Sequence, residues 1–193
     1  MARRVYFAFH YQKDIWRVNQ VRNSWVTQER EVSGYYDASL WEKAKKESDL
    51  ALKRLINGGI QNTSVTCVLI GSETHQRRWV QYEIIKSFDK GNGLLGVYIH
   101  NLKNQDKETS VKGNDPFGDL GIRLSADGKS ASVSVWKNQK WITFEDYPRV
   151  SCNYKSEYGG NFYRLSQLGY KLYDWIENDG YNNFNNWIED SLN

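Results

Sequence analysis

The chain has 193 residues, which suits one ordinary domain and is too short for two large ones. Its 26 basic and 23 acidic side chains leave a net charge of +3, so composition favours neither nucleic acid nor a membrane surface as a partner. Aromatic residues make up 15% of the chain, and this much ring surface excludes a disordered protein.

Cysteine content and hydropathy exclude further classes of protein. Cys67 and Cys152 are too few for a disulfide framework or for a closed zinc site with four ligands. No apolar run approaches the roughly 20 residues of a membrane span, and the N-terminus turns polar too soon for a signal peptide. We therefore expect a cytoplasmic protein with reduced thiols and no metal.

The first part of the chain predicts alternating strands and helices. Residues 3–9 form a short β-rich apolar run, and apolar residues at helical spacing follow over 14–28. GYYD, at 34–37, is short enough for a second strand. Ser39 and Glu42 then form an S-x-x-E capping box, which predicts a helix running to about residue 57.

The central part of the chain repeats this alternation. Residues 64–71, SVTCVLIG, are β-branched and continuously apolar, as expected for a central strand covered on both faces, with Cys67 buried in its middle. Residues 72–90 predict a helix and 94–100 a fourth strand. The order indicates an α/β fold with a doubly wound, mainly parallel sheet and flanking helices.

The last part of the chain departs from this pattern. Residues 101–128 are polar and glycine-rich and predict a loop or insertion. Residues 132–144 predict two short strands, either the fifth strand of the sheet or an edge hairpin. Apolar spacing predicts a helix over 166–176 and a short terminal helix over 184–192.

Ligands of open α/β sheets bind beyond the carboxyl ends of the strands, and this rule selects the candidate binding residues. The turns after the first three strands supply His10, Tyr11, Asp37, Ser39, Trp41, Ser72, Arg77, Arg78 and Trp79. Such a set of rings and hydrogen-bonding groups suits a nucleotide.

The common nucleotide, metal and hydrolase motifs are missing. The chain has neither G-x-G-x-x-G after the first strand nor a P-loop. His10, His75 and His100 follow three different elements and show no metal-ligand spacing. Ser72 lacks the G-x-S-x-G context of a nucleophilic serine.

Glu83 is the most unusual acid of the chain. Trp79 and Glu83 fall on one face of the predicted helix at i and i+4, next to its apolar face, so Glu83 borders the core. The alternative is a solvated glutamate that pairs with Lys86 or Arg78.

Three stretches carry a resemblance to a known family: RVYFAFHYQ, YYDASLWEKAKK and TSVTCVLIGSETHQRRWVQYEIIKSFDKGNGLLGVYIHN. With them the chain resembles the TIR-like proteins of the bacterial Thoeris antiphage system, a branch of the Toll/interleukin-receptor fold. The resemblance implies one TIR-like, flavodoxin-like domain over 1–193. Its core would span about 1–100, and an insertion with a C-terminal extension would span about 101–193.

The resemblance also implies an activity. TIR enzymes carry a W-x-x-x-E arrangement, which Trp79 and Glu83 match, so Glu83 is implied as the catalytic glutamate. The implied reaction cleaves the bond between nicotinamide and ribose in NAD and cyclises the rest to an ADP-ribose isomer that activates a separate effector. NAD would be the substrate, with no cofactor, and the protein could self-associate.

Two other functions remain open: a TIR-like interaction module without turnover, and a nucleoside deoxyribosyltransferase, which also uses a glutamate on an N-glycosidic bond. In the enzyme hypothesis, Tyr11, Trp41 or Trp79 would pack against nicotinamide or adenine, and Arg77 or Arg78 would meet the pyrophosphate. For both tryptophans, core packing is the alternative.

Overall fold

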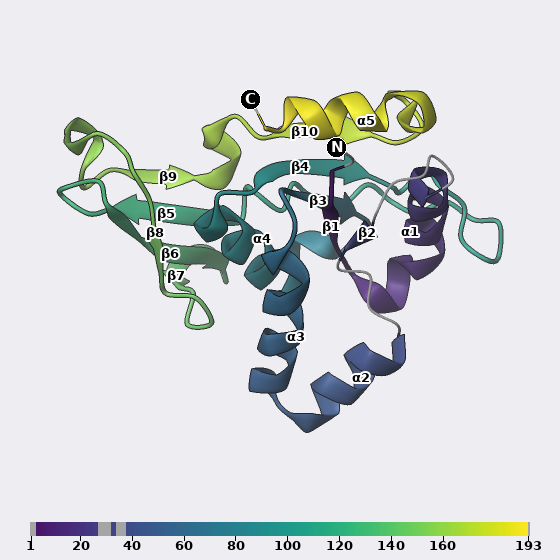
Figure 1. Cartoon of the computed structure of the whole chain (residues 1–193), viewed down its shortest axis with the longest axis horizontal. Helices are drawn as coiled ribbons and strands as arrows, with labels where there is room; N and C mark the ends of the chain where they lie inside the picture. Colours follow the sequence, from purple (N-terminus) through teal and green to yellow (C-terminus); the bar gives the residue numbers. More distant parts are fainter. Residues whose placement is uncertain (1–2, 27–31, 34–37, 193) are drawn as a thin grey trace.

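A five-stranded parallel sheet forms the centre of the computed structural model, which describes residues 3–26, 32–33 and 38–192 (Figure 1). The strands lie in the order β10-β4-β3-β1-β2. They are β1 (Val5–Phe9), β2 (Val32–Ser33), β3 (Val65–Ile70), β4 (Gly93–Tyr98) and β10 (Lys171–Asp174). The flavodoxin-like order 2-1-3-4-5 matches this one, so the predicted TIR-like α/β fold is confirmed.

β3 is the most buried strand, as its sequence predicts. All six residues are buried, and the strand pairs in parallel with β1 on one side and β4 on the other. Cys67 has no exposed surface. A strand covered on both faces needs apolar side chains in both alternating directions, which VTCVLI supplies.

Helices cover both faces of the sheet. α1 (Tyr11–Val26) and α5 (Gly180–Asp190) lie on one face, where Val21 and Phe184 pack with Cys67 of β3. α3 (Asp49–Gln61) and α4 (Arg78–Lys90) lie on the other face, where Ile56 and Ile84 pack in a second cluster. The predicted terminal helix corresponds to α5, and α1 begins three residues before the predicted start.

The single helix predicted over 39–57 is wrong, because two helices occupy this stretch. α2 (Ala38–Glu47) and α3 are separated by Ser48, whose backbone is extended and whose hydroxyl accepts a hydrogen bond from the Ala51 amide. The capping serine is therefore Ser48, whereas Ser39 already lies within α2. The strand predicted at 34–37 lies outside the described residues.

The helix predicted over 72–90 is shorter than expected. A 3-10 turn, η1 (Thr74–Gln76), comes first, and α4 begins only at Arg78. α4 ends at Lys90 and is capped by Gly91, whose φ of 79° places it in the left-handed region that suits glycine.

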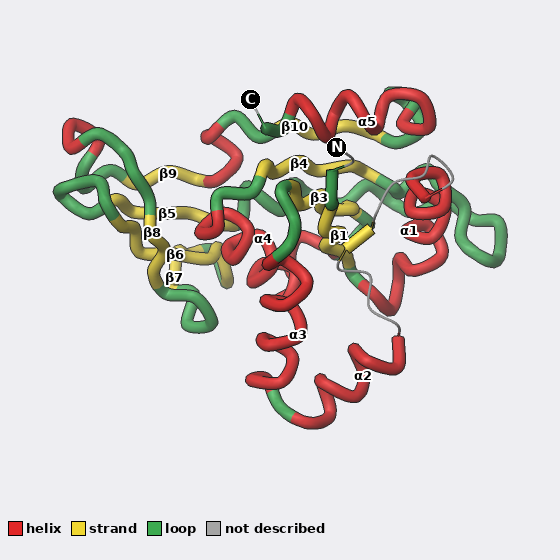
Figure 2. Tube along the Cα trace, viewed as in Figure 1, coloured by secondary structure: helices red, strands yellow, loops and turns green. Residues whose placement is uncertain are grey.

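A second, antiparallel sheet lies beside the first (Figure 2). Its strands are β5 (Leu120–Leu124), β6 (Ser130–Lys137), β7 (Lys140–Thr143), β8 (Arg149–Ser151) and β9 (Phe162–Arg164). The segment 101–128, which was predicted to be a loop, thus contains a strand, β5. The alternating side chains of this strand could have indicated it. The segment 132–144 is the β6–β7 hairpin of this sheet and does not supply the fifth parallel strand.

That fifth strand comes from the C-terminal segment, where a helix over 166–176 was expected. A 3-10 turn, η3 (Leu165–Leu168), ends at Gly169 with a φ of 89°, and β10 then pairs with β4. Tyr173 of β10 stacks on Trp187 of α5 at 4.3 Å between ring centres. Pairing with an open sheet edge overrides the helical spacing of the apolar residues.

Among the described helices, none combines the length and the hydropathy that crossing a membrane requires.

Candidate active site

Glu83 is buried between α4 and the first strand. Only 4% of its surface is exposed, and its Oε1 accepts a 2.6 Å hydrogen bond from the Tyr6 hydroxyl of β1. Its Oε2 is buried without a hydrogen-bond partner among the described residues. A carboxyl with one free oxygen in the core is an unusual feature that calls for a functional explanation.

Burial raises the pKa of Glu83 to about 8, against the opposing influence of the hydrogen bond from Tyr6. Removal from water disfavours the charged carboxylate, whereas the hydroxyl donor favours it. The carboxyl is therefore mostly protonated at neutral pH. A cation brought close to it would shift the balance toward the carboxylate.

Glu83 is not the solvated, ion-paired glutamate of the alternative interpretation. Lys86 instead donates to the Tyr147 hydroxyl at 3.2 Å. Arg78 forms ion pairs with Asp146 and Asp49, both at 2.6 Å.

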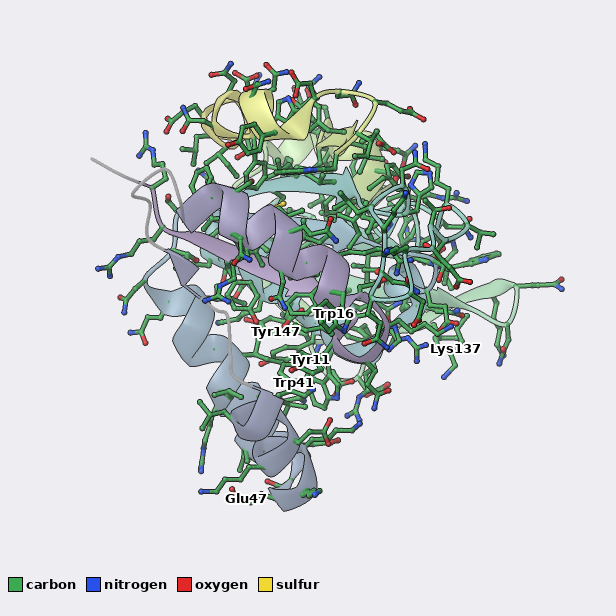
Figure 3. All side chains as sticks on the ribbon, turned by 90° about the vertical axis from the view of Figure 1, so that its right-hand side faces the viewer. Tyr11, Trp16, Trp41, Glu47, Lys137 and Tyr147 are labelled. Atoms are coloured by element: carbon green, nitrogen blue, oxygen red, sulfur yellow. The ribbon has the colours of Figure 1, made fainter. Side chains whose placement is uncertain are left out.

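A pocket of about 210 Å³, here called the rim pocket, opens beyond the carboxyl end of β1, between α2 and the start of α4. It contains six of the predicted binding residues: His10, Tyr11, Trp41, Arg77, Arg78 and Trp79. Figure 3 shows two of them, Tyr11 and Trp41, as near neighbours. The fold thus brings together, in one pocket, residues that the strand-end rule predicted from three separate turns.

Glu83 does not line the rim pocket and lies deeper in the core. It follows Trp79 by one helical turn, on the same face of α4. Tyr6 and Ala8 lie on the same side of β1, since side chains of a strand alternate, and His10 directly follows the strand. His10 lines the rim pocket, and Tyr6 of the strand before it donates to Glu83.

Cations outnumber acids among the residues that line the rim pocket. Burial and the nearby cations Arg77, Lys13 and Lys45 lower the pKa of His10 to about 4, so this side chain is neutral at pH 7. Lys45, Arg77 and Arg78 line the pocket together with one acid, Glu42. Such a surface attracts anionic groups such as phosphates.

The rings and arginines of the pocket also have structural partners. Trp41 and Trp79 are partly buried against the core, so they pack there and line the pocket at once. The Arg78 guanidinium lies 4.5 Å from the centre of the Trp79 ring, and Arg77 forms an ion pair with Glu73. Their contribution to substrate binding stays a prediction.

Three predicted binding residues are not placed in the rim pocket. Ser72 lies half-buried in the turn after β3 and does not line it. Ser39 lies in the first turn of α2, and its side chain is outside the described part of the structure. Asp37 lies outside the described residues.

Tyr6, Lys45 and Asp14 lie at the site but were not among the residues predicted from the sequence. The alternation of side chains along β1 could have indicated Tyr6. Lys45 lies four residues after Trp41, on the same face of α2, and this spacing could have indicated it. Asp14 of α1 is buried, with its carboxyl against Gly71 at the end of β3, and burial raises its pKa to about 6. No local pattern marks that contact, because it joins two segments far apart in the chain.

Hollows also lie elsewhere on the described surface. One of about 580 Å³ lies on the outer side of α1 and contains neither carboxylates nor histidines. Another, of about 670 Å³, lies between α4 and the second sheet. Within the described ranges, no group of three or more His, Cys, Asp or Glu residues is placed to hold a metal ion.

Comparison with known proteins identifies the family. Residues 6–104 match the family model described as "Thoeris protein ThsB, TIR-like domain". The chain is also 51% identical over 192 residues to a Bacillus cereus (strain MSX-D12) protein named "Putative cyclic ADP-D-ribose synthase ThsB1", with 97% of this chain and 100% of the relative covered. The chain therefore belongs to the Thoeris ThsB family of TIR-like proteins.

Proposed function

We propose that this protein cleaves the nicotinamide–ribose bond of NAD and closes the remaining ADP-ribose into a cyclic isomer. The observation that carries the proposal is Glu83, a buried carboxyl with a free oxygen, which lies one helical turn beyond Trp79 of the ring-lined rim pocket. The name of the Bacillus cereus relative, which matches over its whole length, supports the same reaction.

The chemistry needs one well-placed carboxylate. Nicotinamide leaves C1′ of the ribose with the bonding electron pair and becomes neutral, so no acid has to protonate it. The ribose gains oxocarbenium character, which a carboxylate in a site of low dielectric stabilises. A hydroxyl or ring nitrogen of the same molecule then bonds to C1′, and an attacking hydroxyl releases its proton.

The substrate itself would ionise Glu83. Its carboxyl is mostly neutral in the free protein, since burial raises its pKa to about 8. The pyridinium of NAD carries a positive charge, and an opposite charge within about 4–6 Å favours the ionised carboxyl. The negative charge thus develops where the transition state needs it.

Signalling is the second part of the proposal. The cyclic product would leave the protein and activate a separate effector with a nucleotide-sensing domain. Self-association would raise the activity of a resting protein by completing its site. NAD serves as the consumed substrate, and no cofactor takes part.

Incubation with NAD, followed by mass spectrometry, tests the reaction. We expect nicotinamide and a product with the mass of cyclic ADP-ribose. Linear ADP-ribose alone would indicate a simple hydrolase. A parallel incubation with deoxynucleosides tests for a deoxyribosyltransferase, and a properly assembled protein that turns over neither substrate would indicate an interaction module.

A further inference from the structure

The C-terminal half of the chain and the start of α4 together enclose a hollow. We call it the sheet pocket; its volume is about 670 Å³. His75, Gln76, Arg78 and Gln81 line one side. The β6–β7 hairpin and the turn after it supply the opposite side, with Val135, Trp136, Lys137, Asn138, Ile142, Thr143, Phe144 and Asp146.

The sheet pocket and the rim pocket are neighbours. Both flank the first turn of α4, and Arg78 lines both. Asp146 and Asp49 hold the Arg78 guanidinium at this boundary through contacts of 2.6 to 2.7 Å. α4 follows the carboxyl end of β3, so both pockets lie on the side of the sheet where ligands of such folds bind.

The rim pocket is too small for a whole dinucleotide. Pockets for ligands of drug size typically measure about 300–1,000 Å³. The rim pocket, at about 210 Å³, falls below that range, whereas the sheet pocket, at about 670 Å³, falls within it. A molecule as long as NAD therefore needs a second compartment.

The lining of the sheet pocket suits an adenosine. Val135, Ile142 and Phe144 offer an apolar wall for a purine ring, with Trp136 at its edge. Asn114 and Gln81 add side-chain amides, which can pair with the edge of the base.

Asp119 is the acceptor that a ribose requires. It lines the sheet pocket, and no described residue donates a hydrogen bond to its carboxylate. Asp146, in contrast, is engaged by Arg78 and Lys53. Burial raises the pKa of Asp119, and the nearby His75 and Arg164 oppose this rise. Its carboxylate oxygens can accept hydrogen bonds from the two hydroxyls of a ribose.

We propose that the sheet pocket binds the adenosine half of NAD, while the rim pocket holds the nicotinamide end over Glu83. The pyrophosphate then crosses at Arg78, near Arg77 and Lys45 of the rim pocket. This inference rests on the proposed function and deepens it. Holding both ends of the dinucleotide keeps an internal nucleophile close to C1′, which favours cyclisation over hydrolysis.

The proposal gives the C-terminal half of the chain a role in the site. The family model matches residues 6–104, whereas Asp119 and the β6–β7 hairpin lie beyond that range. Recognition of adenosine would thus come from a part of the chain outside the matched TIR-like segment.

Thr143→Trp tests the proposal by blocking the sheet pocket, because Thr143 is exposed and lines it. Ser132→Trp is the matched control: Ser132 is exposed on a strand of the same sheet and does not line the pocket. We expect Thr143→Trp to raise KM for NAD at least tenfold while kcat stays within about twofold, because uniform binding is lost. Ser132→Trp should match the wild type.

Nuclear magnetic resonance with AMP tests the pocket without turnover. AMP should shift the resonances of residues 135–144 and the Trp136 indole in the wild type and in Ser132→Trp, and not in Thr143→Trp. Nicotinamide mononucleotide should instead shift Tyr11, Trp41 and Trp79. Shifts by AMP confined to the rim pocket, or equal in all three proteins, would overturn the assignment.

The two proposals can fail separately. If the wild type turns over NAD while AMP leaves residues 135–144 unshifted, the pocket assignment is wrong and the reaction stands. If AMP shifts those residues and NAD is never consumed, the reaction is wrong and the pocket remains a nucleotide site.

Discussion

Glu83 is an acidic residue in the core, where the charged form of a carboxyl is least stable. Glu83 is almost fully buried, and one hydrogen bond, from Tyr6, offsets part of the loss of hydration. A group that serves only packing would be apolar at this position, since an apolar side chain avoids the penalty of burying a polar atom without a partner. The acid is therefore best explained by chemistry.

Tyr6→Phe should raise the pH at which turnover reaches half of its maximum. The Tyr6 hydroxyl favours the ionised form of Glu83, so its loss raises a pKa that is already about 8. Hydrogen bonds to charged groups contribute about 1.5–3 kcal/mol, so activity at pH 7 should fall about tenfold and recover in part at higher pH. The rate of NAD consumption measured from pH 6 to about 10 gives the midpoint.

Tyr82→Phe is the control, because the Tyr82 hydroxyl donates to Asn57 at 3.1 Å and does not contact Glu83. An identical midpoint for Tyr6→Phe and the wild type would show that Tyr6 does not position or tune the acid.

Glu83→Gln should stabilise the fold at alkaline pH. The folded-state pKa of about 8 lies above the ordinary value of 4.5, so the folded protein holds a proton that the unfolded chain releases. Wild-type stability therefore falls as pH rises from about 5 to 8, by roughly 3 kcal/mol. The amide does not ionise, and its oxygen still accepts from Tyr6, so Glu83→Gln escapes this loss.

Thermal unfolding at pH 5 and at pH 8 measures the effect, with Glu47→Gln on the exposed end of α2 as the control. The Tm of Glu83→Gln should exceed that of the wild type more at pH 8 than at pH 5. A difference that is equal at both pH values would mean that Glu83 is ionised throughout.

At the scale of elements, local signals explain part of the architecture. β3 is predictable because a fully apolar, β-branched run has no stable place except the middle of a sheet. The W-x-x-x-E spacing on α4 is likewise visible in the sequence, since a helix brings i and i+4 to one face. The strand-end rule also selects most of the rim pocket.

Other elements depend on contacts that a local pattern does not contain. β10 is a strand because the edge of β4 is available to pair, although its apolar residues have helical spacing. β5 forms because β6 and β9 pair with it on both sides. The hydrogen bond between Tyr6 and Glu83 joins residues 77 positions apart, so no local sequence pattern predicts it.

Ser48→Ala should loosen the junction between α2 and α3. The Ser48 hydroxyl accepts from the Ala51 amide at 3.0 Å and caps α3. Loss of such a cap lowers stability by about 1 kcal/mol. Chemical denaturation measures the change; Ser48→Asp keeps an acceptor and should restore most of the stability, and equal stability of Ser48→Ala and the wild type would contradict the assignment.

In the molecule as a whole, the last segment of the chain, from β10 to α5, completes the central sheet and its cover. β10 forms its edge, and Trp175, Trp187 and Ile188 pack in the same cluster as Val97 of β4. The predicted division into a core over about 1–100 and an extension remains a description of the sequence resemblance. Folding of the core is expected to require the extension.

A chain that ends at residue 165 should therefore lose cooperative unfolding, because it lacks β10 and α5 and exposes the apolar side chains they cover. A chain that ends at residue 190 keeps both elements and serves as the control. Near-ultraviolet circular dichroism during heating measures the transition. A sharp, wild-type transition in the shorter chain would mean that residues 1–165 fold alone.

A comparison of three proteins tests whether Glu83 is the catalytic residue. Wild type, Glu83→Gln and the surface control Glu47→Gln are incubated with NAD at equal concentration, and nicotinamide and the cyclic product are quantified by mass spectrometry. We predict that the wild type and Glu47→Gln form both products and that Glu83→Gln, folded and at least as stable, forms neither above about a thousandth of the wild-type rate. A Glu83→Gln protein that consumes NAD at a rate comparable to the wild type would contradict the assignment of Glu83 as the catalytic residue.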